Sequence, residues 1–130
     1  MLRIIWIVLV GFFPLALAQS TDEISKDINK GIEQGSARAI SRHFGQNVEL
    51  YIPGSEGTFS RAQSEIILRD FFSRNTVETY TVSHQRSARD GSLYVLGTLK
   101  TEEGQHYRTY YLIKRVSQNY FLHQLQIESR

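Results

Sequence analysis

The spacing of apolar residues changes from helical to strand-like a little past the middle of the chain. Before Asn75, apolar side chains mostly recur every three or four residues, which is the repeat of a helix with one buried face. Serines stand at the expected helix starts, and Ser60 has the capping-box spacing to Gln63. Glycines stand where the first two segments end. The pattern therefore predicts three helices, within residues 20–35, 36–45 and 60–75.

Strand-like alternation follows, with one earlier example at Val48–Ile52 that stops at Pro53-Gly54. After Asn75, four runs rich in Val, Thr, Tyr and Leu are separated by pairs of turn-forming residues. Helices followed by a long antiparallel meander indicate an α+β fold, with the helices covering one face of a curved sheet. The three turns are predicted at Asp90-Gly91, Glu103-Gly104 and Gln118-Asn119.

Treating each turn as two residues long predicts the register of the sheet, because paired residues then sum to a constant within each hairpin. The large aliphatic side chains then share one face: Val82, Val95, Leu99, Leu112 and Leu125. On that face the register aligns His84, Gly97, Tyr110 and Ile127 in one row, with Arg108 in the next. Gly97 carries no side chain, so it leaves space beside His84 and Tyr110. This predicts a small ligand pocket formed by His84, Gly97, Arg108 and Tyr110. The alternative is a filled core in which His84 and Tyr110 only satisfy each other or the backbone.

The same register predicts an apolar and aromatic patch on the opposite face. Leu96 would pair with Tyr111 and Tyr94 with Ile113, and the three helices would all be needed on the other side. Exposed patches of this kind usually mark association surfaces. The expected association is a two-fold homodimer through Tyr94, Leu96, Tyr111 and Ile113, and the alternative is a different envelope protein on the same patch.

The N-terminus has the three parts of a secretory signal peptide. Arg3 precedes an apolar run from Ile4 to Leu17, and Ala16-Leu17-Ala18 is a small-x-small cleavage site. The run is shorter than the roughly 20 residues of a membrane span. We therefore expect a signal peptide at 1–18 and a single soluble domain at 19–130, in the periplasm or secreted.

Composition narrows the chemistry further. The chain has no cysteine, which excludes disulfides, thiolate zinc sites and an N-terminal lipid anchor on cysteine. The net charge is only +2, so no single-sign field indicates nucleic acid as a partner. The four histidines show no metal-ligand spacing, and no phosphate-binding or nucleophile motif is present. We expect no metal and no cofactor.

The layout of helices, strand, helix and meander resembles the cone-shaped fold shared by nuclear transport factor 2, ketosteroid isomerases and polyketide cyclases. The resemblance covers essentially the whole of 19–130. More narrowly, four segments resemble an uncharacterised family of exported bacterial domains: Val48-Glu49-Leu50, Gly57 to Phe72, Gly97-Thr98-Leu99 and Tyr110-Tyr111-Leu112. The resemblance implies the nuclear transport factor 2-like fold and implies almost nothing about activity.

The resemblance also allows one test for catalysis. Isomerases of this fold carry a catalytic carboxylate just before the Pro-Gly that ends the first strand, and this chain has Ile52 there. Glu49 lies three residues earlier and thus on the opposite face. The first hypothesis is therefore a non-enzymatic ligand-binding or interaction module of the bacterial envelope. The second is a small isomerase or cyclase that uses His84 as base, with Tyr110 or Arg108 polarising a carbonyl.

Overall fold

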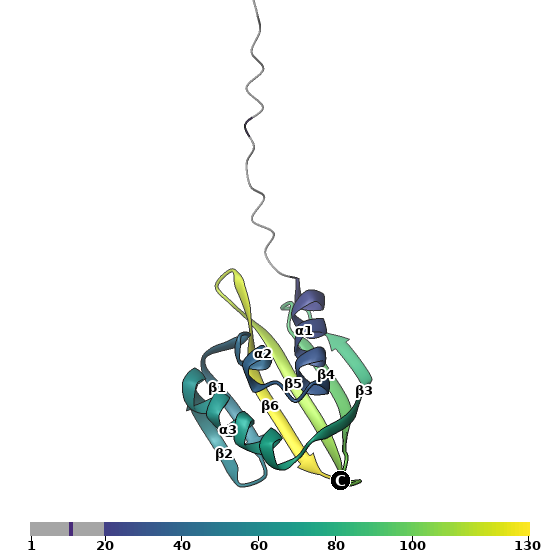
Figure 1. Ribbon diagram of the computed structural model, residues 1–130. Helices are drawn as coiled ribbons and strands as arrows, with labels where there is room; N and C mark the ends of the chain where they lie inside the picture. Colours follow the sequence, from purple (N-terminus) through teal and green to yellow (C-terminus); the bar gives the residue numbers. More distant parts are fainter. Residues whose placement is uncertain (1–10, 12–19) are drawn as a thin grey trace, which may run out of the picture.

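The structure is a computed structural model that describes residues 20–130 and Gly11. The expected signal peptide and its cleavage site after Ala18 lie outside the described residues. In the described part, helices pack on one face of a sheet, which confirms the predicted α+β class (Figure 1). The helices are α1 (Thr21–Glu33), α2 (Ala37–Ser41) and α3 (Arg61–Arg74).

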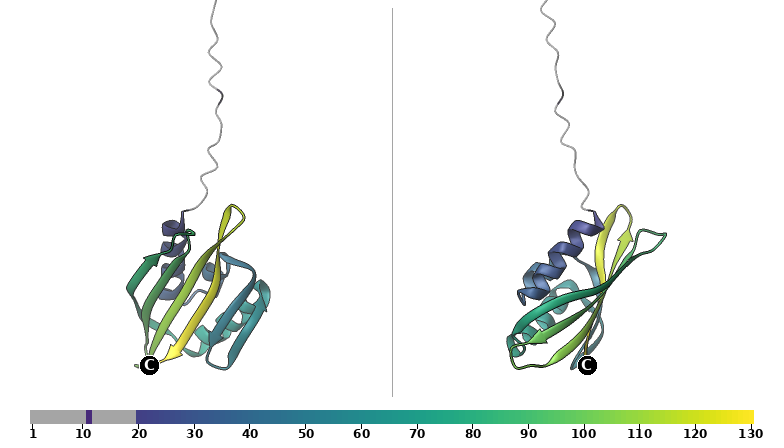
Figure 2. Two further views of the ribbon diagram at one scale, coloured as in Figure 1. Left: turned by 180° about the vertical axis from the view of Figure 1, so that it is seen from behind. Right: turned by 90° about the vertical axis from the view of Figure 1, so that its right-hand side faces the viewer.

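The sheet has six strands in the order β2-β1-β6-β5-β4-β3. Neighbours run antiparallel except β1 and β6, which are parallel. Figure 2 shows the curved sheet with the helices of residues 20–130 on its concave side and none of them on the other. We call that other side the helix-free face. The strands are β1 (Phe44–Ile52), β2 (Ser55–Ser60), β3 (Val77–Ser87), β4 (Leu93–Thr101), β5 (His106–Val116) and β6 (Asn119–Ser129).

A serine caps the start of each of these helices, as the sequence predicts. The side chains of Ser20, Ser36 and Ser60 accept hydrogen bonds from backbone N–H groups three residues later. At α3 the Gln63 side chain also reaches back to the Ser60 N–H, which completes the capping box. Gly35 has a φ of 62° and lets the chain leave α1 in the left-handed region. None of the described helices has the length and apolar character that crossing a membrane requires.

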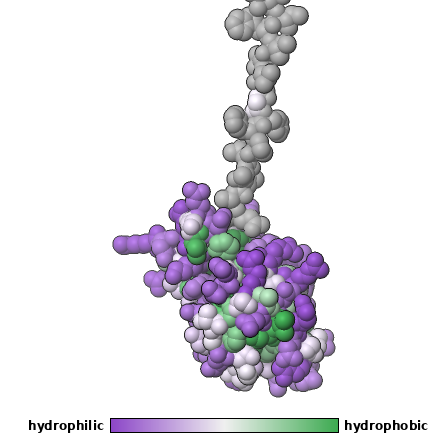
Figure 3. All heavy atoms as spheres, turned by 90° about the vertical axis from the view of Figure 1, so that its left-hand side faces the viewer, coloured by the Kyte–Doolittle hydropathy of each residue, from purple (hydrophilic) through white to green (hydrophobic). Residues whose placement is uncertain are grey.

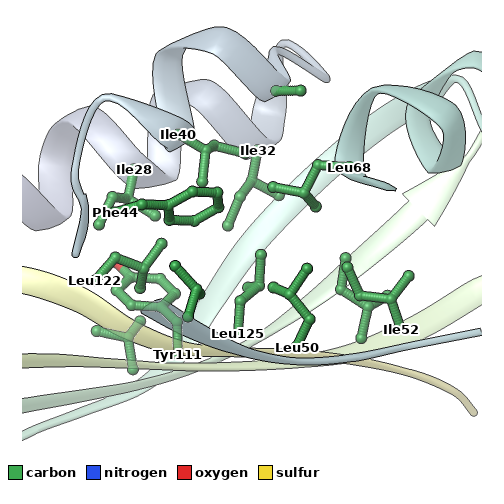
Figure 4. Packing of buried hydrophobic residues seen from close by; sticks show 14 of the residues in the cluster. Ile28, Ile32, Ile40, Phe44, Leu50, Ile52, Leu68, Tyr111, Leu122 and Leu125 are labelled. Atoms are coloured by element: carbon green, nitrogen blue, oxygen red, sulfur yellow. The ribbon is translucent and has the colours of Figure 1, made fainter. Parts of the chain in front are cut away.

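The core lies between the helices and the concave side of the sheet. Isoleucines of α1 and α2 point down from the helices, and Leu50, Tyr111 and Leu125 point up from the strands (Figure 4). Tyr111 is the largest of the side chains that are less than 2% exposed. Its hydroxyl donates to Asn29 Oδ1 at 2.6 Å and lies 3.4 Å from the Ser25 carbonyl oxygen. Tyr111 therefore joins the middle of the sheet to α1.

The β4–β5 connection differs from the predicted two-residue turn. Thr101 N–H bonds the Gln105 carbonyl, so the loop contains three residues, Glu102 to Gly104. Val95 consequently pairs with Tyr111, where the sequence-based register had Leu112. Since successive strand residues point to opposite faces, this single step turns all of β5 over. The prediction for the faces of β5 was wrong for this reason.

The β5–β6 turn lies one residue earlier than predicted. This difference offsets the one at the β4–β5 loop, so β6 keeps the faces predicted for it. The turn residues are Ser117 and Gln118, and Ser117 has a φ of 59°. A bulge between Leu112 and Ile113 restores part of the shift, so Tyr111 pairs with Leu125. Val95 and Leu125 therefore share a concave row as predicted, with Tyr111 between them.

Two elements differ from the predicted ones. Strand β2 was not expected, because Ser-Glu-Gly-Thr-Phe-Ser at 55–60 has only one large apolar residue. It pairs with β1 as an edge strand. The second helix was expected to continue to Gly45 but ends at Ser41, and Phe44 already belongs to β1. Phe44 remains fully buried, so its apolar character served the core rather than a helix.

The three-residue loop makes a prediction for its glycine. Gly104 has a φ of 88° and no neighbour within 4 Å of a Cβ placed on it. Gly104→Ala should therefore lower the free energy of unfolding by about 1–2 kcal/mol through backbone strain alone. Urea unfolding measures this, with Gly45→Ala as the control, because Gly45 lacks a positive φ and its Cβ would make ordinary contacts.

A substitution at the neighbouring residue, Glu103, distinguishes the three-residue loop from the predicted two-residue turn. A type I′ turn would hold Glu103 at positive φ, so Glu103→Gly would stabilise it. In the structure Ser117 alone among the described non-glycine residues has positive φ. We expect Glu103→Gly to leave the free energy of unfolding unchanged or slightly lower. A clear increase in it would contradict the three-residue loop.

Candidate functional site

The residues of the predicted pocket lie on two different faces of the sheet. His84 pairs with Leu96, Leu96 with Tyr110, and Tyr110 with Gln126, so these four form a row on the helix-free face. Arg108 is exposed on the same face, opposite Thr98 and Glu128. Gly97 faces the helices. The structure therefore brings His84 and Tyr110 into one row as expected, but with Leu96 between them and outside the cone.

The register of β3 explains the position of His84. The β3–β4 loop runs from Ala88 to Ser92, because Ala88 N–H bonds the Ser92 carbonyl at 2.8 Å. Asp90 Oδ1 accepts from Ser92 N–H at 2.9 Å, which favours this longer loop over a two-residue Asp-Gly turn. A bulge between Val82 and His84 adds a second shift, and Val82 thereby lies opposite Gly97.

The space beside Gly97 is already occupied. A Cβ built on Gly97 would lie 2.8 Å from Tyr80 Cε2 and 2.9 Å from the Tyr80 hydroxyl oxygen. The Tyr80 ring thus covers the glycine, and burial raises the pKa of its hydroxyl. The predicted ligand pocket at this position is wrong, and glycine is needed there for close packing with β3.

The apolar patch on the helix-free face also consists of residues that differ in part from the predicted ones. Tyr111 and Ile113 are fully buried under the helices and cannot contact another molecule in the folded domain. Tyr94 and Leu96 are exposed as predicted, at 38% and 36%. Their partners on β5 are Leu112 and Tyr110. The convex patch, as we name it, consists of Tyr94, Leu96, Tyr110 and Leu112.

The convex patch has an aromatic centre. The Tyr94 and Tyr110 rings lie 6.2 Å apart, tilted by 37°. Partial burial raises the pKa of Tyr110, and the neighbouring Tyr94 adds to this. The Tyr110 phenol therefore stays neutral at ordinary pH. The patch offers two apolar rings with hydroxyl groups at their edges.

The position that holds a carboxylate in isomerases of this fold is apolar inside this domain. Ile52 is buried in the core. Glu49 pairs with Gln124 on the helix-free face, so it does not reach the interior. Among residues 20–130, no group of three or more His, Asp or Glu side chains is placed to hold a metal ion.

One buried histidine was not singled out by the sequence. His43 is 6% exposed, and its Nε2 lies 3.2 Å from Asp27 Oδ2 on α1. Burial lowers the pKa of His43, the Asp27 carboxylate acts against this, and Arg42 lowers it further. The net direction is downward, so the folded domain favours a neutral imidazole whose Nε2–H donates to Asp27. The contact ties α1 to the segment that leads into β1.

Comparisons with known proteins agree with this fold. A family model described as a domain of unknown function, DUF4783, matches residues 25–128. A DUF4783 family protein from Bacteroides ovatus has 27% sequence identity and a TM-score of 0.73, over 80% of this chain and 93% of that chain. A DUF4783 family protein from Bacteroides uniformis has 25% sequence identity and a TM-score of 0.74, over 81% of this chain and 95% of that chain.

An NTF-2-like protein of unknown function from Silicibacter pomeroyi is 12% identical with a TM-score of 0.59, over 84% of this chain and 92% of that chain. At that identity the likeness shows the fold alone, and it confirms the nuclear transport factor 2-like architecture. The search of curated proteins finds no match.

The buried His43 makes a pH-dependent prediction. Because its pKa is lowered in the folded state, the unfolded chain binds more protons below about pH 6.5, the ordinary value. The free energy of unfolding should therefore fall as the pH drops through the window just below that value. Urea unfolding at about pH 7.5 and about pH 5.5 measures the difference.

His43→Gln is the matched variant, since it keeps a polar group near Asp27 but does not titrate. We expect it to show a smaller loss of stability between the two pH values. If the original protein instead became more stable on acidification, the attraction to Asp27 would outweigh burial and the assignment would fail.

Proposed function

We propose that this chain, which belongs to the DUF4783 family of domains of unknown function, is an exported, non-enzymatic interaction module of the bacterial envelope. Export is supported by the apolar run behind Arg3 and the Ala16-Leu17-Ala18 site. A non-enzymatic role is supported by the apolar Ile52, where isomerases of this fold carry their carboxylate. The observation that carries the proposal is the convex patch on a face that α1, α2 and α3 leave uncovered.

A second copy of the chain is the partner we propose for this patch. Four large apolar or aromatic residues in two adjacent pairs form a compact area on β4 and β5. Aromatic side chains at the centre of an interface supply much of its binding energy. The surface around the centre is polar, with Gln124 and Gln126 on one side and His84 and Arg86 on the other. This arrangement has the apolar centre and polar rim of protein–protein interfaces.

Charges on the two sides of the patch are complementary. Glu49 on β1 and Glu56 on β2 lie toward one edge of the helix-free face. Arg86 on β3 lies at the other edge, opposite Tyr94. No ion pair of these three is found within the part of the chain that the structure describes. They are thus available to a partner.

The strand order selects one geometry for the pair. A two-fold axis parallel to the strands and between β4 and β5 stacks each β4 on the β5 of the second copy. Tyr94 then meets Leu112, and Leu96 meets Tyr110, so the patch covers itself. Strand β1 of one copy falls one strand spacing, about 4.8 Å, outside β3 of the other. Glu49 and Arg86 occupy the same row, and this places their opposite charges side by side twice in the dimer.

Charge reversal tests the proposed function and its geometry. In the dimer, Glu49→Arg and Arg86→Glu should each weaken association by about tenfold or more, because each change places like charges together twice. The double variant should recover most of the affinity. Sedimentation velocity over a range of concentrations, on protein expressed from the full chain, measures the dissociation constants.

Tyr110→Lys should abolish the dimer and leave a folded monomer. The control is Ile66→Lys, which adds the same charge at a 61% exposed apolar residue of α3, away from the sheet. Equal effects of the two lysines would indicate loss of folding rather than loss of an interface. A protein that stays monomeric at all concentrations would contradict the homodimer and leave a different envelope protein as the occupant of the patch.

A further inference from the structure

Pairing in the sheet is interrupted at one place on both sides of β6. Phe44 of β1 pairs with Leu122, but the next pair is Glu49 with Gln124, so four residues of β1 pass a single residue of β6. On the other side, β5 pairs with Leu122 and Gln124 through a bulge. His123 has no paired residue in either neighbouring strand. Such bulges redirect side chains and often lie beside functional sites.

A cavity of about 430 Å³ opens at this interruption. This volume lies within the roughly 300–1,000 Å³ that is typical of small-molecule sites. Its apolar wall is formed by Gly45, Val116 and Phe121. A Cβ on Gly45 would lie 3.6 Å from the Phe121 Cβ, an ordinary contact distance, so Gly45 and Phe121 lie side by side in this wall. Val116 is 52% exposed and extends the wall toward solvent. We call this cavity the β1–β6 cavity.

The rest of the β1–β6 cavity is lined by groups that donate hydrogen bonds. They are Gln46, Asn47, Arg61 and His123, from β1, the start of α3 and β6. No acidic side chain from the described part of the chain lines the cavity. Figure 3 views the molecule from the side of β1, β2 and α3 and shows apolar areas bordered by hydrophilic side chains. The cavity thus combines an apolar wall with a cationic, amide-rich one.

Arg61 has no structural partner that explains its charge. Among residues 20–130, the carboxylates within ion-pair distance of a base contact His43, Arg69, Arg74 and Lys100 instead. Arg61 is also the first residue of α3, whose first turn contains no acidic residue. A cation at a helix N-terminus is unfavourable because it opposes the helix dipole. Arg61 therefore adds positive charge where the helix would favour an anion.

We propose that the β1–β6 cavity binds a small monocarboxylate with an aromatic or branched apolar body. The guanidinium of Arg61 suits the two oxygens of a carboxylate, and its single positive charge matches one negative charge. The amides of Gln46 and Asn47 and the His123 imidazole supply further donors. The apolar body of the ligand contacts Phe121 and Val116. This site uses none of the convex patch residues, so it stands independently of the proposed dimer.

The test uses phenylacetate as the probe. It is added to ¹⁵N-labelled protein expressed from the full chain, and amide shifts are followed by NMR. We expect saturable shifts at Gly45, Asn47 and His123. Phenylacetamide keeps the ring without the charge, and acetate keeps the charge without the ring. Each should bind about tenfold more weakly than phenylacetate, since each lacks one half of the recognition.

Arg61→Gln is the decisive variant, with Arg69→Gln as the control on the same helix outside the cavity. Arg61→Gln should weaken the binding of phenylacetate about tenfold and leave the binding of phenylacetamide unchanged, because it removes only the charged contact. Arg69→Gln should change neither. Absence of saturable shifts at the cavity residues with phenylacetate would overturn the proposal. Equal binding of phenylacetate by the original protein and Arg61→Gln would also overturn it.

Discussion

The alternation of side chains along β5 is the constraint on which the rest of the structure depends. The three-residue loop at Glu102–Gly104 directs Tyr111 and Ile113 toward the helices and Tyr110 and Leu112 away from them. A loop shorter by one residue would exchange the two sets. Arg108 would then enter the core, and an unpaired buried charge is strongly destabilising. The same loop thus determines both the centre of the core and the composition of the helix-free face.

Much of the fold follows from the sequence, because its local signals are strong. The serine caps locate the helices, and Val95, Leu99 and Leu125 have the side predicted for them. The site did not follow, because Tyr110 to Ile113 is a run of four apolar residues in which alternation cannot distinguish the faces. The length of the β4–β5 loop decides which of these side chains face the core. Glu103-Gly104 suits either a two-residue turn or the end of a three-residue loop. The bulge at Val82/His84 left no sequence signal, and neither did the interruption around His123.

The two proposed sites share one physical origin. With the three described helices on the concave side, most large aliphatic residues are buried in the core, and the helix-free face is left open to other molecules. Where pairing is regular, on β4 and β5, that face presents tyrosine and leucine side chains in matched pairs. Where β1 departs from β6, a cavity opens that is lined by hydrogen-bond donors, one of them from the start of α3. A regular sheet suits association with a flat partner, whereas an interrupted one makes room for a small ligand.

The most direct test of this account compares two adjacent tyrosines. Tyr111→Phe removes a hydroxyl that donates to Asn29 inside the domain, so urea unfolding should show a loss of about 1 kcal/mol or more. Tyr110→Phe changes a hydroxyl on the helix-free face and should alter the free energy of unfolding by less than about 0.5 kcal/mol. The measurement is made on the monomer, at protein concentrations low enough for dissociation. A larger loss for Tyr110→Phe than for Tyr111→Phe would contradict the register of β5 and, with it, the core and the convex patch.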